Sequence, residues 1–385
     1  MIARVFLTRA LRNIGYGWLA VALALILRDR GYSAQSIGLL LTLALGAGAV
    51  YAAATGKLVR RFDRRLTLVI ASLVLALSGV LLATQSALVP MIVTMLLGTV
   101  GAGTQEVGPF ASLEQTLIAD AGGKKAATFF GRYNLIGAFA IAFGAAIPSI
   151  APPLVATWGY VAIGLLLAAL YASLPATSVP AHEPEKHVSP NVPRAVERLA
   201  ALFAFDAFGG GIIVQSFMVY WFAVRFNADA TVLGILFFAV NVISAFSLLS
   251  AAPLARRIGP VRAMVYTHLP SNALLVAIPF MPSFELAAIV LLLRFALSQI
   301  DVPVRQAMVM AIVPPEERPR AAGLTNSVRP AAAAFGPLLA GATMATASMG
   351  LPFFLAGGIK IAYDLAILAQ FHHLDAKLLA ESKAP

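Results

Sequence analysis

The sequence predicts an all-α polytopic membrane protein, and three observations support this fold class. The chain of 385 residues is 60% hydrophobic and only 12% charged, whereas soluble domains are about 45–50% apolar and about 25% charged. Apolar stretches long enough to cross a bilayer recur along the whole chain. The connections between these stretches alternate between rich and poor in basic residues. A water-soluble fold is therefore excluded.

Twelve stretches are long enough to cross the hydrocarbon core as helices, which takes about 20 residues each. The predicted spans lie near 10–28, 35–57, 66–85, 88–112, 126–148, 152–174, 199–224, 231–254, 263–281, 285–312, 321–346 and 350–371. Arg4, Arg9 and Arg12 precede the apolar run from Ile14 to Leu27, which resembles a signal peptide. No small-residue cleavage site follows it, so we interpret it as a retained helix.

Basic residues mark one side of the predicted membrane. The connections on that side carry Lys57, Arg60, Arg61, Arg64, Arg65, Lys124, Lys125, Lys186, Arg194, Arg198, Arg256, Arg257, Arg262, Arg318 and Arg320. The opposite connections carry only Arg28, Arg30 and Arg225. The positive-inside rule makes the basic side cytoplasmic and places both termini there. We expect the inner (plasma) membrane, and the net charge of +11 then requires no nucleic-acid partner.

The spans fall into two groups of six, separated by the longest polar segment. We predict an N-terminal bundle over 1–175, a cytoplasmic linker over 176–198 and a C-terminal bundle over 199–385. The two groups share residues at nearly constant offsets, which indicates an internal repeat. The matches are Leu58-Val59-Arg60-Arg61 with Leu254-Ala255-Arg256-Arg257, Gly131, Asn134, Phe143 and Gly144 with Gly323, Asn326, Phe335 and Gly336, and Gln115 with Gln306. The bundles are therefore expected to be pseudo-symmetric.

The loop after the second predicted span reads Gly56-Lys57-Leu58-Val59-Arg60-Arg61-Phe62-Asp63-Arg64-Arg65. With the parallel repeat, it resembles the major facilitator superfamily of transporters over essentially the whole chain. The family's loop motif is Gly, three residues, Asp, basic, any residue, Gly, basic, basic. Here Arg60 stands at the Asp and Asp63 at the second Gly.

The resemblance implies that the motif's carboxylate helps to lock the outward-open state, and Asp63 could supply that carboxylate here. The candidate gate residues in this loop are Arg60, Arg61, Asp63 and Arg64. The alternative is that the basic cluster only sets the topology.

Ionisable side chains at bilayer depth are costly and are therefore functional candidates. Glu106 lies past the midplane of the fourth span, and Asp206 lies beside three glycines in the seventh. Arg294, near mid-depth in the tenth span, requires either a carboxylate or an anionic substrate. The resemblance implies that spans 1, 4, 7 and 10 line a central cavity. The predicted residues for substrate binding or proton coupling are Glu106, Gln105, Asp206, Arg294, Tyr16 and Asn13. The alternative for Glu106 is a structural partner of a nearby arginine.

Further charged residues lie nearer the predicted cytoplasmic ends, where salt bridges favour an inner gate over substrate contact. These candidate gate residues are Glu114, Arg132, Asp301 and Arg305. Lys360 and Asp364 lie one helical turn apart, so we expect them to neutralise one another as a structural pair.

The sequence contains no cysteine, no nucleophile elbow, no zinc-binding helix and no nucleotide-binding loop, so we expect neither a cofactor nor an enzyme. We predict a secondary active transporter that works by alternating access and performs proton-coupled efflux of a small amphiphilic or toxic compound. The alternatives are uptake of a small organic anion and a non-transporting receptor on the same fold. The expected partners are a small-molecule substrate, protons and the lipid bilayer, with the protein as a monomer.

Overall fold

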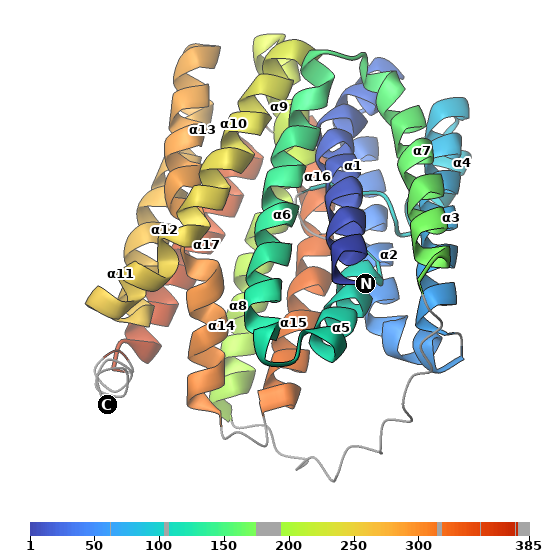
Figure 1. The fold of residues 1–385 in the computed structure, drawn as a ribbon. Coiled ribbons are helices and arrows are strands. Elements are labelled where there is room, and N and C mark those ends of the chain that lie inside the picture. Colours follow the sequence, from blue (N-terminus) through green and yellow to red (C-terminus); the bar gives the residue numbers. More distant parts are fainter. Residues whose placement is uncertain are drawn as a thin grey trace. The chain divides into compact units, whose positions relative to one another are not determined.

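The computed structural model describes residues 1–61, 63–103, 108–174, 194–313, 318–346, 348–373 and 375, and all of its regular structure in these ranges is helical (Figure 1). Within these ranges, nine segments are long and apolar enough to cross a membrane. Large apolar side chains on the span at 64–84 are exposed along one side, at Leu66, Ile70, Leu73 and Leu77. A stripe of this kind suits contact with lipid acyl chains.

The chain divides into two compact units. The first unit comprises Met1–His182 and Val214–Asn241, and the second comprises Glu183–Ile213 and Val242–Pro385. The first contains α1 (Ile2–Asp29), α2 (Ala34–Arg61), α3 (Arg64–Thr84), α4 (Leu88–Leu96), α5 (Phe110–Gly122), α6 (Ala126–Ala146), α7 (Pro153–Ala172) and α9 (Gln215–Phe226). The second contains α8 (Arg194–Ile212), α11 (Ala251–Ile258), α12 (Pro260–Ala277), α13 (Phe284–Ser298), α14 (Asp301–Ile312), α15 (Arg318–Ala334), α16 (Gly336–Thr346) and α17 (Leu351–Phe371). Helix α10 (Ala230–Leu249) has residues in both units.

Five of the twelve predicted spans are each divided between two helices. These are the spans predicted near 88–112, 199–224, 231–254, 285–312 and 321–346, which correspond to α4 with α5, α8 with α9, α10 with α11, α13 with α14 and α15 with α16. Between α4 and α5, Gly98 and Gly108 have φ angles of +66° and +79°. Glycine reaches this left-handed region at little cost, and Pro109 follows directly, so a continuous helix is interrupted there.

Close helix crossings occur at glycines in both units. In the first unit, a Cβ added to Gly17 of α1 would collide with the carbonyl oxygen of Ile141 in α6. In the second unit, a Cβ added to Gly211 of α8 would collide with the carbonyl oxygen of Ala333 in α15. Small residues at such crossings let helix backbones approach closely in a membrane. The glycines fix the register of α1 and α8 against their neighbours.

Candidate functional site

The first buried charge cluster lies in the first unit, where α1 contacts α5, α6 and α7. It consists of Thr8 and Arg12 from α1, Glu114 from α5, Tyr133 from α6 and Tyr171 from α7. Arg12 Nη1 and Nη2 donate to the two Glu114 oxygens at 3.0 and 2.6 Å. The hydroxyls of Thr8, Tyr133 and Tyr171 donate to the same carboxylate at 2.5, 2.8 and 2.6 Å. Arg12 and Glu114 are both fully buried, so this first-unit cluster joins four helices around one ion pair between described residues, which we call the closed pair.

The arginines near the N-terminus correct one sequence expectation. The span was expected to begin near residue 10, after Arg4 and Arg9, but α1 begins at Ile2, and both Arg9 and Arg12 lie buried within it. The Arg9 guanidinium lies 4.3 Å from the ring centroid of Tyr133, beside the first-unit cluster. A hydrophobicity window ends the span at these charges because it does not include the carboxylate that neutralises Arg12.

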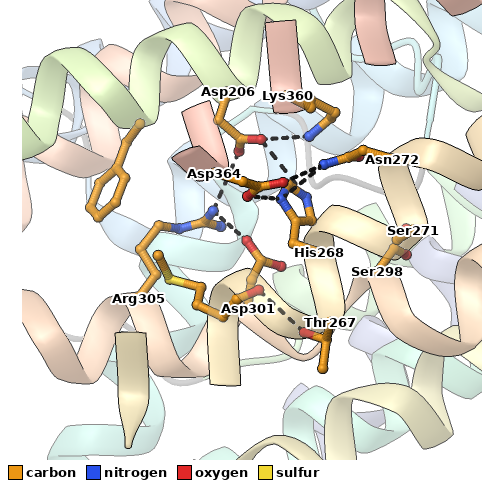
Figure 2. Close-up of polar contacts among 12 residues, drawn as sticks. Asp206, Thr267, His268, Ser271, Asn272, Ser298, Asp301, Arg305, Lys360 and Asp364 are labelled. Carbon is orange, nitrogen blue, oxygen red and sulfur yellow. Dashed lines mark hydrogen bonds and ion pairs between the residues drawn. The ribbon is translucent and has the colours of Figure 1, made fainter. Parts of the chain in front are cut away.

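The second buried cluster lies in the second unit and is centred on the Asp206 carboxylate of α8, which is 3% exposed (Figure 2). Lys360 Nζ of α17 lies 2.5 Å from Asp206 Oδ1. Arg305 Nη1 of α14 and Arg329 Nη1 of α15 lie 3.4 and 3.3 Å from Asp206 Oδ2. Arg305 is shared with Asp301, 2.6 Å away on the same helix. One carboxylate therefore faces three cations from three helices.

A histidine connects this carboxylate to another one. His268 of α12 is 4% exposed. Its Nδ1 lies 2.7 Å from Asp364 Oδ1 of α17, and its Nε2 lies 3.9 Å from Asp206 Oδ1. Asn272 donates from Nδ2 to the second Asp364 oxygen at 2.8 Å (Figure 2). The imidazole thus lies between two buried carboxylates. We call the set Asp206, His268, Asn272, Asp301, Arg305, Arg329, Lys360 and Asp364 the second-unit cluster.

The interpretation of Lys360 and Asp364 as a self-neutralising pair is wrong. Lys360 contacts Asp206 on α8, and Asp364 contacts His268 and Asn272 on α12. Both residues are buried, at 7% and 1% exposed. Spacing along one helix indicates which side chains share a face, but partners from neighbouring helices bind more directly here.

Arg294 of α13 is also in the second unit and is 5% exposed. Its Nε and Nη1 atoms are buried and have no hydrogen-bond partner among the described residues. Its guanidinium carbon lies 4.6 Å from the ring centroid of the adjacent Phe295. The sequence predicted that Arg294 requires either a carboxylate or an anionic substrate. No carboxylate within the described ranges forms an ion pair with Arg294.

Other predicted binding residues lie in the first unit. Tyr16 and Asn13 of α1 are fully buried, and Tyr16 packs 6.5 Å from the ring of Tyr160. Neither amide atom of Asn13 has a hydrogen-bond partner in the described part of the chain. Glu106 and Gln105 lie outside the described residues.

The predicted gate residues have varied surroundings, and gating stays a prediction for all of them. Arg132 on α6 is exposed, with no ion pair to a described residue. Arg60 and Arg61 end α2, but their side chains lie outside the description. Asp63 precedes α3 without a capping hydrogen bond. Arg64 Nη1 lies 2.5 Å from Asp120 Oδ2 on α5.

His268 and Asn272 were not predicted as site residues, because they lie in an apolar helix and only acidic and strongly basic residues were considered there. A signal did exist, since both are polar residues at helical spacing within the ninth predicted span. Buried polar residues in a membrane helix usually face a partner rather than lipid. That rule, applied to amides and imidazoles as well as to charges, would have found them.

Comparison with known proteins identifies the architecture. The sequence profile of the Major Facilitator Superfamily matches residues 5–300 and 199–374. An uncharacterized membrane protein of Saccharomyces cerevisiae, YJR124C, is 25% identical over 417 residues, which cover 96% of this chain and 93% of that protein.

Solved transporter structures share the fold over nearly the full length. The nucleoside transporter NupG matches with a TM-score of 0.78 at 14% identity, over 96% of this chain and 98% of that one. A D-xylose-proton symporter matches with 0.73 at 16% identity, over 95% and 97%. The human organic anion transporter MFSD10 matches with 0.66 at 17% identity, over 95% and 98%.

These matches confirm the family resemblance and the polytopic helical fold that the sequence predicted, and they favour a transporter over a receptor that moves nothing. The chain therefore belongs to the major facilitator superfamily and is a multi-pass membrane protein and a secondary transporter of small solutes, not an enzyme.

Proposed function

We propose that this transporter is driven by protons and that His268, with Asp206 and Asp364 beside it, holds the transported proton. The observation that carries the proposal is the position of the buried imidazole, 2.7 Å from one carboxylate and 3.9 Å from the other. A neutral imidazole has one donor and one acceptor nitrogen, whereas the imidazolium donates from both. Two flanking carboxylates suit the charged form.

Proton binding at this position has a direct route to helix movement. An imidazolium at His268 competes with Lys360 for the same oxygen, Asp206 Oδ1. Lys360 ties α17 to α8 through that oxygen. A proton that weakens this contact favours a different arrangement of α8 and α17. A ligand or proton changes conformation only through such a difference in contacts between two states.

The test is accumulation in proteoliposomes driven by a pH gradient, compared with exchange of labelled for unlabelled solute without a gradient. A solute panel comes first, to find one that the protein exchanges. In His268→Gln we expect gradient-driven accumulation to fall at least tenfold while exchange persists. The matched control is His372→Gln, because His372 is exposed at the end of α17. Accumulation that persists in His268→Gln contradicts the proposal.

Glu106 is the second candidate for the proton site, motivated by its predicted depth in the fourth span. Glu106→Gln in the same assay separates the two sites. If Glu106→Gln loses gradient-driven accumulation while His268→Gln keeps it, the proton site lies in the fourth predicted span and not in the second unit.

For the substrate and direction, our first expectation is efflux of a small amphiphilic or toxic compound, and the alternative is uptake of a small organic anion. Arg294 favours the anion, because a buried guanidinium whose Nε and Nη1 have no hydrogen-bond partner among the described residues suits a negatively charged solute. Loading the solute inside or outside the vesicles, with the gradient imposed in each direction, decides between efflux and uptake.

We also propose that the protein lies in the inner (plasma) membrane with both termini cytoplasmic, on the strength of the basic loops. The chain has no cysteine, so a single introduced thiol reports its side without background. Ser86 and Lys125 are both exposed and lie on opposite predicted sides. In intact cells, an impermeant maleimide should label Ser86→Cys and spare Lys125→Cys; the reverse pattern would invert the topology.

A further inference from the structure

The guanidinium of Arg294 is a buried charge in the second unit that the proposed proton site leaves unused. Two of its nitrogens, Nε and Nη1, are buried and have no hydrogen-bond partner in the described part of the chain. A buried, unsatisfied charged donor is costly. The position of Arg294 within a membrane-spanning region increases that cost. A partner that arrives from outside the protein would remove it.

The carboxylates of the second-unit cluster are already engaged elsewhere. Asp206 faces Lys360, and Asp301 holds Arg305 at 2.6 Å. Asp364 accepts from His268 and Asn272. Each would have to leave a closer partner in order to neutralise Arg294.

The charges of this region also leave an excess. Its fixed cations are Arg294, Arg305, Arg329 and Lys360, and its carboxylates are Asp206, Asp301 and Asp364. With His268 neutral, one positive charge is uncompensated among the described residues of this region. A single bound anion would neutralise the region, and Arg294 is the cation that forms no ion pair with a described carboxylate.

A second unsatisfied group lies on the neighbouring helix. Asn272 donates from Nδ2 to the Asp364 carboxylate, which can only accept, so the orientation of the amide is fixed. Its Oδ1 is then buried without a hydrogen-bond partner among the described residues. Ser271 Oγ donates to the backbone oxygen of Arg294 at 3.1 Å, which joins α12 and α13 at this level. Among the described residues, α13 therefore offers two unpartnered guanidinium nitrogens, and the neighbouring α12 offers an unpartnered amide oxygen.

We infer that Arg294 binds the carboxylate of a small organic anion, and that Asn272 Oδ1 accepts a hydrogen bond from a hydroxyl or amide group of the same molecule. The inference rests on the proposed function and names the substrate class of that transporter. The planar guanidinium fork matches a carboxylate with two parallel hydrogen bonds. The free acceptor distinguishes a substituted organic acid from chloride.

Binding without a pH gradient is the test, because it does not depend on proton coupling. Thermal unfolding of the purified full chain is followed with monocarboxylates from lactate and propionate to benzoate, each beside its neutral amide, and with chloride. Ligands that bind only the folded protein raise its unfolding temperature by mass action. We expect at least one carboxylate to stabilise the protein where its amide does not, and hydroxylated acids to bind more tightly than their unsubstituted analogues.

Variants assign the effect to the guanidinium. Arg294→Gln should weaken carboxylate binding about 10- to 100-fold, because it removes a charged donor pair. The unliganded variant should unfold at a higher temperature than the wild type, because an uncompensated buried charge is gone. Arg294→Lys keeps the charge without the fork and should bind with intermediate affinity. Arg225→Gln is the control, since Arg225 is exposed at the end of α9.

Three results would overturn the inference: no carboxylate stabilises the protein, chloride stabilises it as well as any carboxylate does, or Arg294→Gln and Arg294→Lys bind as tightly as the wild type. Failure of the proton proposal looks different. In that case carboxylates still stabilise the protein through Arg294, but a pH gradient drives no accumulation. If gradient-driven transport of an uncharged solute occurs without carboxylate binding, the inference fails and the proposed function stands.

Discussion

The first-unit and second-unit clusters both neutralise a carboxylate that is buried among helices, but they do so with different arrangements of cations. In the first, one cation among the described residues donates two hydrogen bonds to one buried carboxylate, and three hydroxyls donate to the same carboxylate. In the second, Asp206 is shared among three cations, and two of these contacts are longer than 3.2 Å. A closed pair has one good arrangement, whereas a shared carboxylate has several of similar energy. The first suits a fixed joint between helices, and the second suits a switch.

The repeat strengthens this comparison because the two central ion pairs occupy related positions with opposite signs. Arg12 precedes Gly17, at its helix crossing, by the same number of residues as Asp206 precedes Gly211. Their partners, Glu114 and Arg305, come directly before the glutamines matched by the repeat. The pair is therefore Arg12 with Glu114 in one unit and Asp206 with Arg305 in the other. Each pair is electrically neutral, although the positive and negative residues have exchanged places between the two units.

Breaking the closed pair should have the largest effect on stability. Glu114→Gln removes the carboxylate that pairs with the buried Arg12, and such single removals cost about 3–5 kcal/mol. We expect poor yield and a large fall in the detergent unfolding temperature. The exchanged variant, Arg12→Glu with Glu114→Arg, copies the signs of the second unit and should recover part of the loss. Equal stability of Glu114→Gln and the wild type would mean that this pair does not hold the helices together.

Removing one cation from each cluster tests the difference directly. Arg12→Met should cost about as much as Glu114→Gln, because no other cation forms an ion pair with that carboxylate among the described residues. Lys360→Met leaves Asp206 with Arg305 and Arg329, so we expect a loss of about 1–3 kcal/mol, typical of one charged hydrogen bond. Unfolding temperatures of the two variants provide the measurement. A larger loss in Lys360→Met would reverse the assignment of joint and switch.

The sequence predicts single charged residues of these clusters but not the partners that come from distant parts of the chain. Asp206, Glu114, Asp301 and Arg305 were identified because a charge within an apolar span is visible in any window. The sign exchange was visible too, since the matched glutamines each follow a charged residue. The partners were not visible, because Lys360 meets Asp206 across 154 positions of the chain, and Glu114 meets Arg12 across 102. Such contacts depend on which helices are neighbours.

The fold itself was more predictable than its interruptions. Hydrophobic length identified the spans because the bilayer core sets one length for all of them. The breaks within the fourth, seventh, eighth, tenth and eleventh predicted spans were not predicted, since an apolar stretch looks continuous even where the helix is divided. Gly98 and Gly108 were informative there only in retrospect, because glycine is also common in unbroken membrane helices.

The N-termini of α3 and α12 extend the comparison outside the membrane. Asp63 precedes α3 without a capping bond, whereas α12 follows Gly259 and is capped by Asp375, which accepts from the backbone N–H of Val261 and Arg262 at 2.7 and 3.1 Å. Burial raises the pKa of Asp375, and the two N–H groups only partly oppose that shift. The carboxyl therefore stabilises the fold most at acid pH, and this contribution is lost as the pH rises through the raised pKa.

Asp375→Ala should cost about 0.5–2 kcal/mol, as for other lost caps, while Asp63→Ala should cost less. Asp375→Asn keeps an acceptor without a buried charge and should lie near the wild type at neutral pH. Unfolding temperatures measured at pH 5 and pH 7.5 provide the check. Equal losses in Asp375→Ala and Asp63→Ala would show that the distant carboxylate does not act as a cap.

The smallest expected effect on stability concerns Arg64 and Asp120, which form an ion pair at 2.5 Å with the Asp120 side chain 57% exposed. Exposed pairs contribute about 0.2–1 kcal/mol because water and salt screen them. Asp120→Asn should therefore leave the unfolding temperature almost unchanged, in contrast to Glu114→Gln on the same helix.

If Arg64 belongs to a gate, Asp120→Asn should still change the rate of solute exchange. A weak contact that forms in only one conformation shifts the balance between conformations by the full energy of that contact. An unchanged exchange rate at unchanged stability would assign the basic loop to topology alone.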